Sequence, residues 1–334
     1  MKKAFITGIT GFVGSALALR LAREDTQVFG LARNPARFTG KNDGITVLKG
    51  DLADFNRVHL IVEKENAIDQ NTVVYHCAAV LGAAHARKKE YNLINTDSTI
   101  KLFDLAVKLK AKKFLYISSI SAVGPVGSIQ NPMTEQTEAK PILYYSISKL
   151  LAENHLIQNS QLNRMPVIIV RPPNIYGPGM NKKSGAALIF KGCKNKVFAI
   201  IGRGKNYVNF AYIDNIVEGI ICCTNSVDKG VEIFFISDSQ PYIVDELLNA
   251  IKNAIGSNTF IIKFPYFLIF PLAFLVEKFG KLISRDIGFD RELVKGLATN
   301  AYLFSIEKAQ NIGFKSPVKL SEGIKLTLEY LKKN

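Results

Sequence analysis

The chain has 334 residues, of which 48% are hydrophobic and 21% charged, and its net charge is +15 at pH 7. These values exclude a disordered chain and allow one large or two closely packed globular domains. The basic residues form scattered pairs without interleaved aromatic residues, and no run reaches the roughly 20 apolar residues of a membrane-spanning helix, so neither a nucleic-acid partner nor a membrane span is predicted.

The first half of the chain alternates short β-rich runs with amphipathic segments. This alternation predicts parallel strands covered by helices on both faces, which is a Rossmann-type doubly wound α/β sheet. The predicted strands lie at residues 3–7, 27–32, 46–49, 72–76, 113–118 and 167–171.

After residue 171 the rhythm changes to glycine-rich loops at 177–185 and 202–204, a strand at 232–237, and helices at 244–255, 268–279 and 320–332. We predict that residues 1–171, joined by 209–237, form the sheet domain. Residues 172–208 and 238–334 then form a smaller, mostly helical domain.

Three glycines separate the first predicted strand from a helix predicted at 15–23. A glycine has no Cβ, so the backbone turns sharply and approaches a pyrophosphate, toward which the helix directs its positive end. In this context the loop predicts a dinucleotide site in the sheet domain. Its predicted contacts are Gly8, Thr10, Gly11, Phe12, Val13 and Gly14.

The second predicted strand runs into Arg33, where an acid that bonds the ribose hydroxyls of NAD is expected. Arg33, helped by Arg37, would pair with a 2′-phosphate instead, so we predict NADP in preference to NAD. A solvated surface arginine is the alternative. Asp51, followed by Leu52, is predicted to bond the adenine amino group, or else to cap a helix.

Tyr145 and Lys149 stand four residues apart in a segment with helical spacing, so both project from one face. An ammonium group near a phenol favours the phenolate, and we therefore expect the pKa of Tyr145 to fall from about 10 toward neutrality. Tyr144 is excluded from this role, because Ser148 lies four residues after it. The pair predicts proton transfer to or from a substrate oxygen.

Serines follow the predicted strand at 113–118, at the sheet edge where open α/β folds bind ligands. A hydroxyl there would bond the substrate oxygen and stabilise its developing charge. Ser118, Ser119 and Ser121 are the candidates.

Over essentially its whole length the chain resembles the extended short-chain dehydrogenase/reductase family, within the NAD-dependent epimerase/dehydratase superfamily. Besides the glycine loop and Y-x-x-x-K, the resemblance rests on His76-Cys77-Ala78-Ala79, Asn95-Thr96, Tyr212-Ile213-Asp214-Asn215, and the run Arg171-Pro172-Pro173-Asn174-Ile175-Tyr176-Gly177-Pro178-Gly179.

The resemblance implies a role for each catalytic candidate. Ser119 polarises the carbonyl, Tyr145 is the general acid or base, Lys149 binds the nicotinamide ribose, and Asn95 supports a proton relay. Ser119 is preferred among the serines because its surroundings look like the hydroxysteroid dehydrogenase motif. The resemblance also implies a homodimer and four further cofactor contacts, at Ala78, Ala79, Pro172 and Ile175.

Two branches of the family remain as interpretations. Nucleotide-sugar epimerases and dehydratases typically carry a diphosphate-binding arginine where this chain has Val208, although Asn174 matches an epimerase contact and Lys205 is a partial substitute. The preferred interpretation is an oxidoreductase for a hydrophobic alcohol or ketone, sterol-like or β-keto acid-like, and close to 3β-hydroxysteroid dehydrogenases and 2-alkyl-3-ketoalkanoate reductases. A non-catalytic redox sensor is a second alternative, against which the Ser-Tyr-Lys set argues.

The apolar segment 260–279, with Glu277 near its end, is similar to the corresponding region of the hydroxysteroid dehydrogenase-like proteins. It would cover a hydrophobic substrate, contact a membrane interface through nearby lysines, or pack as a core helix.

Cysteine and histidine spacing gives no indication of a metal site. The four cysteines show no C-x-x-C pair, which argues against zinc and disulfides and favours a reducing, cytoplasmic location. The histidines are interpreted as structural or surface residues: His59, His76, His85 and His155.

Overall fold

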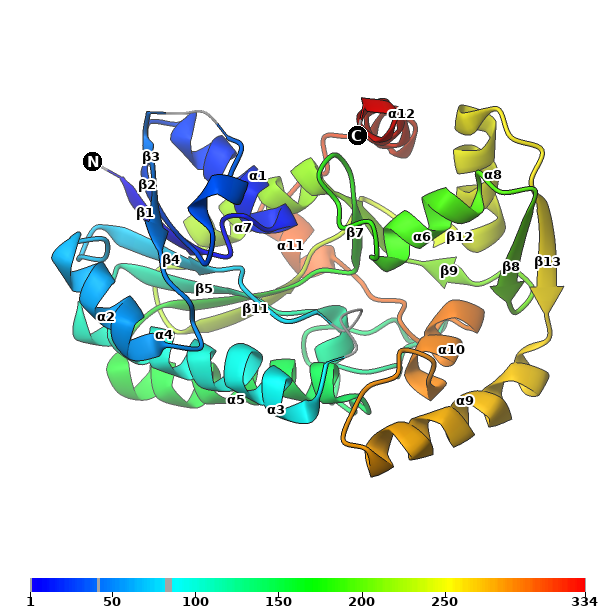
Figure 1. Ribbon diagram of the computed structural model, residues 1–334, viewed down its shortest axis with the longest axis horizontal. Helices are drawn as coiled ribbons and strands as arrows, with labels where there is room; N and C mark the ends of the chain where they lie inside the picture. Colours follow the sequence, from blue (N-terminus) through cyan, green and yellow to red (C-terminus); the bar gives the residue numbers. More distant parts are fainter. Residues whose placement is uncertain (1, 41–42, 82–85, 334) are drawn as a thin grey trace.

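The computed structural model describes residues 2–40, 43–81 and 86–333, so His85 lies outside the described residues. Within these ranges the main sheet has seven parallel strands in the order β11-β6-β5-β4-β1-β2-β3 (Figure 1). The order reverses between β1 and β4, and the predicted doubly wound fold is confirmed. The strands are β1 (Lys3–Thr7), β2 (Gln27–Ala32), β3 (Ile45–Lys49), β4 (Thr72–His76), β5 (Lys113–Ile117), β6 (Val167–Arg171) and β11 (Val231–Phe235).

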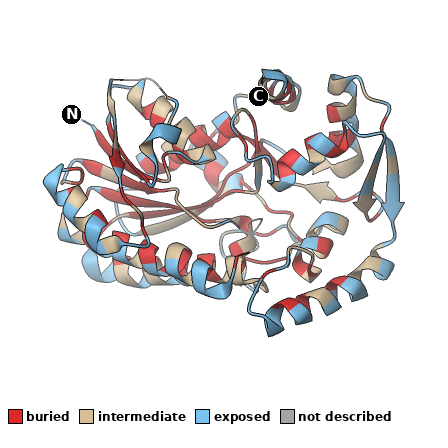
Figure 2. Ribbon diagram, in the orientation of Figure 1, coloured by how far each residue is buried: buried red, intermediate tan, exposed pale blue. Residues whose placement is uncertain are grey.

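Helices cover both faces of the main sheet. On one face lie α1 (Phe12–Ala22) and α7 (Ile213–Ser226), and on the other α2 (Phe55–Lys64), α4 (Ser98–Lys108) and α5 (Tyr144–Asn163). The central strands β1, β5 and β6 are therefore buried at every position, as Figure 2 shows.

The remaining part of the molecule mixes helices with three short strand pairs, which the sequence analysis missed. In β8 and β13 every residue is exposed or half-buried, so no alternation of buried and exposed positions marked them. The pairs are β7 (Asn174–Tyr176) with β10 (Phe210–Tyr212), β8 (Val197–Ile201) with β13 (Phe260–Phe264), and β9 (Tyr207–Val208) with β12 (Tyr242–Ile243).

Helices in this part agree with prediction more closely. The helix expected at 244–255 is α8 (Val244–Ile255), and the last helix is α12 (Leu320–Lys333). The helix expected at 268–279 is longer, α9 (Tyr266–Leu282). The others are α6 (Gly185–Gly192), α10 (Arg291–Ala298) and α11 (Glu307–Asn311).

Several boundaries differ by a few residues. The first helix begins at Phe12 and not at residue 15, because Gly11 already serves as its N-cap. The strand expected at 113–118 ends at Ile117, and the one expected at 232–237 is β11. The predicted domain limits stay a prediction. Among the described residues, none of the helices has the length and apolar character needed to span a bilayer.

Candidate active site

The glycine loop between β1 and α1 packs directly against the segment that follows β4. Gly8 has a φ of +69°, and a Cβ at this position would lie 2.8 Å from the Cα atom of Ala78. A Cβ at Gly14 would lie 2.3 Å from the carbonyl oxygen of Gly8, which also accepts a 2.8 Å hydrogen bond from the Gly11 amide. Larger residues are therefore excluded at Gly8 and Gly14, and the two loops meet where the strand order reverses.

The amino terminus of α1 lies at this meeting point. Gly11 is its N-cap, and the first turn, Phe12 to Gly14, contains no acidic residue. Thr10 and Gly11 are exposed. Backbone amides and the helix dipole both favour an anion at such a terminus, so the loop fits the diphosphate of the predicted dinucleotide.

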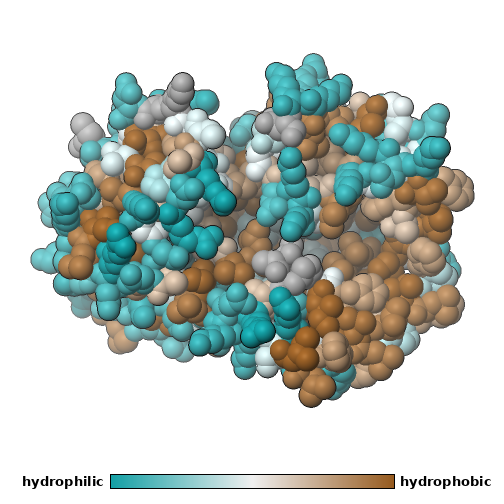
Figure 3. All heavy atoms as spheres, viewed as in Figure 1, coloured by the Kyte–Doolittle hydropathy of each residue, from teal (hydrophilic) through white to brown (hydrophobic). Residues whose placement is uncertain are grey.

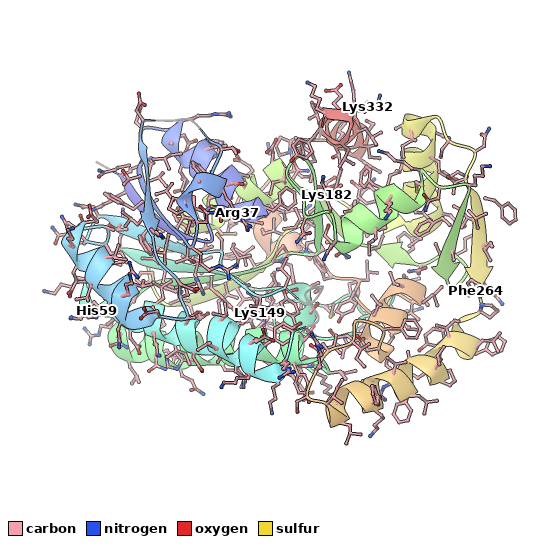
Figure 4. All side chains as sticks on the ribbon, in the orientation of Figure 1. Arg37, His59, Lys149, Lys182, Phe264 and Lys332 are labelled. Carbon is pink, nitrogen blue, oxygen red and sulfur yellow. The ribbon has the colours of Figure 1, made fainter. Side chains whose placement is uncertain are left out.

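Other predicted cofactor residues come from the ends of different strands. Arg33 follows β2 and is exposed, as is Arg37 in the short 3₁₀ helix η1 (Pro35–Arg37; Figure 4). Ala79 follows β4, Pro172 follows β6, and Ile175 lies in β7. Parallel strands place these carboxyl ends at one edge of the sheet. The role of Arg33 in cofactor choice stays a prediction.

Asp51 is held by its own turn. Its side chain accepts a hydrogen bond from the Ala53 amide at 3.0 Å, and Leu52 is buried. The cap of α2 is Asp54, whose carboxylate accepts from the Arg57 amide at 3.4 Å. The interpretation of Asp51 as a helix cap is therefore wrong, and the adenine contact stays a prediction.

Ser119, Tyr145 and Lys149 meet beyond the carboxyl end of β5. The side chains of Ser119 and Tyr145 lie close together, and Ser119 lowers the pKa of the Tyr145 phenol. Lys149, one turn further along α5, donates from Nζ to the carbonyl oxygen of Ile117 at 2.8 Å and lies 4.6 Å from the centre of the Tyr116 ring. Figure 4 shows Lys149 near the middle of the molecule.

The three candidate serines have different partners. The Ser118 side chain is buried, and its hydroxyl has no hydrogen-bond partner in the part of the chain that the structure describes. Ser121 lies near Tyr302, whose hydroxyl donates to Glu292 Oε1. The Ser119 hydroxyl accepts a hydrogen bond from the Ser121 amide at 3.1 Å and lies close enough to Tyr145 to lower its pKa, so its position favours it among the three serines.

The pKa of Tyr145 differs from the expectation. Burial raises it above the usual value of 10.0 and Glu292 raises it further, while the nearby Ser119 side chain lowers it. The Lys149 ammonium is directed to the Ile117 carbonyl, so it does not offset the burial. The expected lowering is therefore wrong for this structure. At pH 7 Tyr145 is a neutral phenol, the form that donates a proton.

Lys149 is shifted by the same burial. Burial lowers its pKa from 10.5 to about 8, and Glu153 and Cys77 oppose this shift. The Glu153 carboxylate, one turn further along α5, accepts hydrogen bonds from Arg171 Nε at 3.0 Å and Nη2 at 2.6 Å. This buried pair fixes α5 against β6 while Glu153 favours the charged form of Lys149.

Asn95 lies in a π-helical segment (η3, Asn92–Asp97) between α3 (Lys88–Tyr91) and α4. Its Nδ2 donates to the Val80 carbonyl and to Ser148 Oγ, both at 3.0 Å, and its Oδ1 accepts from the Val80 amide at 2.8 Å. Asn95 thus ties α5 to the segment after β4. π-helical turns are frequent at functional sites, but the relay role stays a prediction.

His76, at the end of β4, is part of a buried network. Its Nδ1 lies 2.6 Å from Thr7 Oγ1, and its Nε2 lies 2.8 Å from Thr99 Oγ1. Thr99 already donates to the Asn95 carbonyl, so it accepts from Nε2, and this assigns the proton to that nitrogen. Burial, aided by Lys149, lowers the pKa of His76 to about 3, so the ring is neutral.

Two carboxylates from the carboxyl-terminal region hold the start of α5. Leu143, the N-cap of α5, supplies no side-chain cap. Asp286 accepts from the amides of Tyr144 at 3.3 Å and Tyr145 at 3.1 Å. Its negative charge suits the positive end of the helix.

Glu292 is the second of these carboxylates. Its Oε2 accepts from the amides of Ile142 at 3.1 Å and Leu143 at 3.2 Å, and its Oε1 accepts from Ser146 Oγ at 2.7 Å and Tyr302 Oη at 2.6 Å. Burial raises the pKa of Glu292. Four donors compensate for its removal from water.

The sequence analysis did not identify Glu153, Asp286 or Glu292. A signal existed for Glu153, because it continues the four-residue spacing of Tyr145 and Lys149. Asp286 and Glu292 lie more than a hundred residues from the helix that they cap, and no local pattern links such distant positions.

Comparisons with known proteins place the chain among enzymes. The family model described as NAD dependent epimerase/dehydratase family matches residues 4–236. Over 98% of the chain and 95% of the relative, the sequence is 27% identical to a UDP-glucose 4-epimerase of Vibrio cholerae. It is 26% identical to a 3beta-hydroxysteroid-dehydrogenase/decarboxylase of Arabidopsis thaliana, over 77% of the chain and 61% of the relative. The resemblance stated from the motifs is confirmed.

The fold is also found in solved structures. UDP-glucuronic acid 4-epimerase from Bacillus cereus, solved with NAD, superimposes with a TM-score of 0.77 over 99% of both chains at 21% identity. At this identity the likeness supports the fold alone.

Proposed function

We propose that this chain, which belongs to the NAD dependent epimerase/dehydratase family, is an oxidoreductase that interconverts a hydrophobic secondary alcohol and its ketone. The residue that favours a hydrophobic substrate over a nucleotide sugar is Val208. Val208 lies in β9 and is paired with Tyr242 of β12. The family resemblance places a diphosphate-binding arginine at the position of Val208. An apolar side chain there cannot neutralise a nucleotide-sugar diphosphate.

Lys205 does not replace that arginine in this geometry. Its Nζ lies 3.8 Å from the Asp245 carboxylate, and its side chain is mostly exposed. The Lys205 ammonium therefore points toward α8, and it does not supply the positive charge that is missing at Val208.

The catalytic residues suit proton transfer in both directions. The nicotinamide, when bound, supplies or accepts a hydride. Tyr145 then gives its proton to the substrate oxygen in reduction and takes it back in oxidation, while Ser119 holds that oxygen by a hydrogen bond. Lys149, mostly charged at pH 7 with a pKa of about 8, lies one helical turn away and would hold the ribose.

The cofactor proposal is NADP in preference to NAD. It is supported by Arg33 and Arg37, both exposed beyond β2, where a guanidinium group pairs readily with a 2′-phosphate. The Bacillus cereus neighbour was solved with NAD. Titration with NADPH and NADH, followed by nicotinamide fluorescence, separates the two. Arg33→Asp is expected to reverse the preference, and an unchanged ratio would contradict the role of Arg33.

A second candidate is a nucleotide-sugar epimerase that keeps NAD bound. It is favoured by the full-length similarity to the Vibrio cholerae enzyme and by Asn174, which matches an epimerase contact. Purified protein is assayed with a 3-ketosteroid, a long-chain β-keto acid and UDP-glucose. Oxidation of NADPH by a hydrophobic ketone supports the proposal, whereas inversion of the sugar without net cofactor consumption supports the epimerase.

Tyr145→Phe distinguishes both enzymes from a redox sensor. We expect turnover to fall by about 10² to 10⁴-fold, because the proton donor is lost, while nucleotide binding is retained. The matched control is Tyr144→Phe, which removes the neighbouring hydroxyl on the same helix turn. It should leave turnover within about twofold, as for an uninvolved surface change. Equal turnover in the wild type and Tyr145→Phe would contradict the role of Tyr145.

A further inference from the structure

Helix α9 buries small or charged residues and exposes most of its large apolar ones. The residues that it buries are Ala273, Glu277 and Gly280, which lie along one face. Most of its large apolar side chains face outward: Phe267 is 70% exposed and Leu275 is 64% exposed. A helix that stabilises a soluble core normally has the opposite arrangement.

The exposed apolar residues continue from β13 into α9. Figure 3 shows them as a broad hydrophobic area over α9, and Figure 4 places Phe264 at the outer edge of the molecule. We call this area the apolar surface. The residues that define it are Phe260, Phe264, Phe267, Leu268, Leu275 and Phe279.

The exposed charged side chains of the segment that forms the apolar surface are cations. Residues 260–297 contain four acids, and all are buried: Glu277, Asp286, Asp290 and Glu292. The cations of the same segment include four exposed side chains, at Lys263, Lys278, Lys281 and Arg285.

The buried acids are held from within. Glu277 accepts from Arg291 at 2.8 and 2.9 Å and pairs with Lys281 at 2.9 Å. Asp286 and Glu292 cap α5. The negative charge of the segment is thus committed to internal contacts, and its outer face is apolar and positive.

A groove of about 670 Å³ opens beside the start of α9. Arg203, Lys205 and Lys263 line it together with Phe267. Asp245 pairs with Lys263 at 2.7 Å and is near Lys205 at 3.8 Å. Three cations against one carboxylate leave the groove positive next to an apolar edge.

We propose that the apolar surface docks on an anionic lipid membrane. A helix of 17 residues is about 25 Å long. Lying in the interface plane, it would place phenylalanine and leucine among the acyl chains and lysine and arginine among the headgroups, as interfacial helices do. The proposal is independent of the substrate class.

A second copy of the chain is the competing occupant. A two-fold contact would place this surface against itself, with the cations of one copy facing those of the other and the acids of the segment buried. Anionic headgroups complement the same charges, so the observations favour lipid.

Vesicle sedimentation of the full chain tests the proposal. The protein is mixed with vesicles of phosphatidylcholine alone or of phosphatidylcholine with phosphatidylglycerol. We expect binding to the anionic vesicles that weakens with salt, and little binding to the neutral ones. Phe267→Ser with Leu275→Ser should weaken binding at least about tenfold, and Lys278→Glu should weaken it about fivefold or more.

Matched controls lie elsewhere on the molecule. Leu60→Ser removes an equally exposed leucine from α2, and Lys332→Glu changes a lysine on α12, at the opposite side in Figure 4. Both should bind like the wild type, apart from the small change in net charge. Circular dichroism and thermal unfolding verify that every variant is folded.

A fluorescent probe gives an independent measurement, because the sequence contains no tryptophan. In Phe267→Trp the indole should shift to shorter wavelength with anionic vesicles and be quenched by brominated lipid. In Leu60→Trp it should remain in water.

Three results would overturn the proposal. The first is a folded wild type that does not bind anionic vesicles. The second is equal binding by the surface variants and their controls. The third is a dimer, measured by sedimentation equilibrium, that dissociates in Phe267→Ser with Leu275→Ser, which would assign the surface to a second copy.

Discussion

The strands β1, β5 and β6 bury every residue, whereas β13 and α9 bury little and expose most of their phenylalanine and leucine side chains (Figure 2). Both regions are rich in apolar residues, so composition does not distinguish them. What differs is the covering. The sheet has helices on both faces, and α9 packs on its neighbours through Ala273, Glu277 and Gly280. An apolar run therefore signals burial only when another element covers it.

The two regions meet at α5. From the sheet side, Arg171 pairs with Glu153 on this helix, and from the carboxyl-terminal side Asp286 and Glu292 hold its first turn. The helix that carries Tyr145 is thus fixed by polar contacts from both regions. Substitutions in each region measure how much that region contributes to the stability of the fold.

The largest effect is expected at the buried ion pair. Glu153→Gln leaves the Arg171 charge buried without compensation and should lower the free energy of unfolding by about 3–5 kcal/mol, measured by urea denaturation. As a control, Glu153→Leu combined with Arg171→Met should recover most of the loss. A single variant as stable as the wild type would show that α5 does not need the pair.

The comparison of regions is tested directly by two leucines. Leu115→Ala in β5 should cost about 2–5 kcal/mol, because the side chain is fully buried. Leu275→Ala in α9 should change stability by no more than about 0.5 kcal/mol. Similar losses in the two variants would mean that α9 is covered in solution.

Lys149→Met tests the cost of a buried ammonium. The folded pKa is lowered from 10.5 to about 8, so between these values the unfolded chain binds a proton that the folded chain lacks. The stability of the wild type therefore rises with pH through this window, and the cost of about 3 kcal/mol is complete below it. We expect the variant to be inactive, yet more stable at pH 7 by up to that amount.

The pH dependence gives the control for this prediction. The advantage of Lys149→Met should shrink as the pH rises from about 8 toward 10.5. A difference that does not vary with pH would show that the lysine is not desolvated in the folded protein.

A smaller loss of stability is expected at the carboxyl-terminal cap than at the ion pair or at Leu115. Glu292→Gln keeps the shape but removes the charge that four donors share, and should cost about 1–2 kcal/mol. Because Glu292 also raises the pKa of Tyr145, the pH profile of kcat should shift to lower pH. Glu307→Gln, at an exposed position, is the control. An unchanged profile would limit Glu292 to a structural role.

Local signals in the sequence were sufficient for much of the fold. The strands β1, β2, β4 and β6 and the helix α8 have the predicted bounds, because continuous apolar runs and amphipathic spacing report burial within one element. The glycine loop was also identified from a local pattern, because Gly8 and Gly14 stand where the backbone approach leaves no room for a Cβ. The Tyr145 and Lys149 pair needed only helical spacing.

Other features depend on contacts between distant residues. The pKa of Tyr145 is raised because burial by the assembled site exceeds the effect of any neighbour in sequence. Asp286 and Glu292 reach α5 only when the carboxyl-terminal region folds back, and the strand pairs β8–β13 and β9–β12 form for the same reason.

The sequence by itself determined the Rossmann-type sheet, the glycine loop and the helix that carries Tyr145 and Lys149, since each is encoded by residues a few positions apart. The tertiary structure decided which apolar residues are covered. The sequence of segment 260–279 is compatible with a core helix and with a surface helix. In the folded chain Ala273, Glu277 and Gly280 pack inward, so most of the large apolar side chains of α9 are exposed. Exposure depends on the neighbouring elements, and a segment does not encode its neighbours.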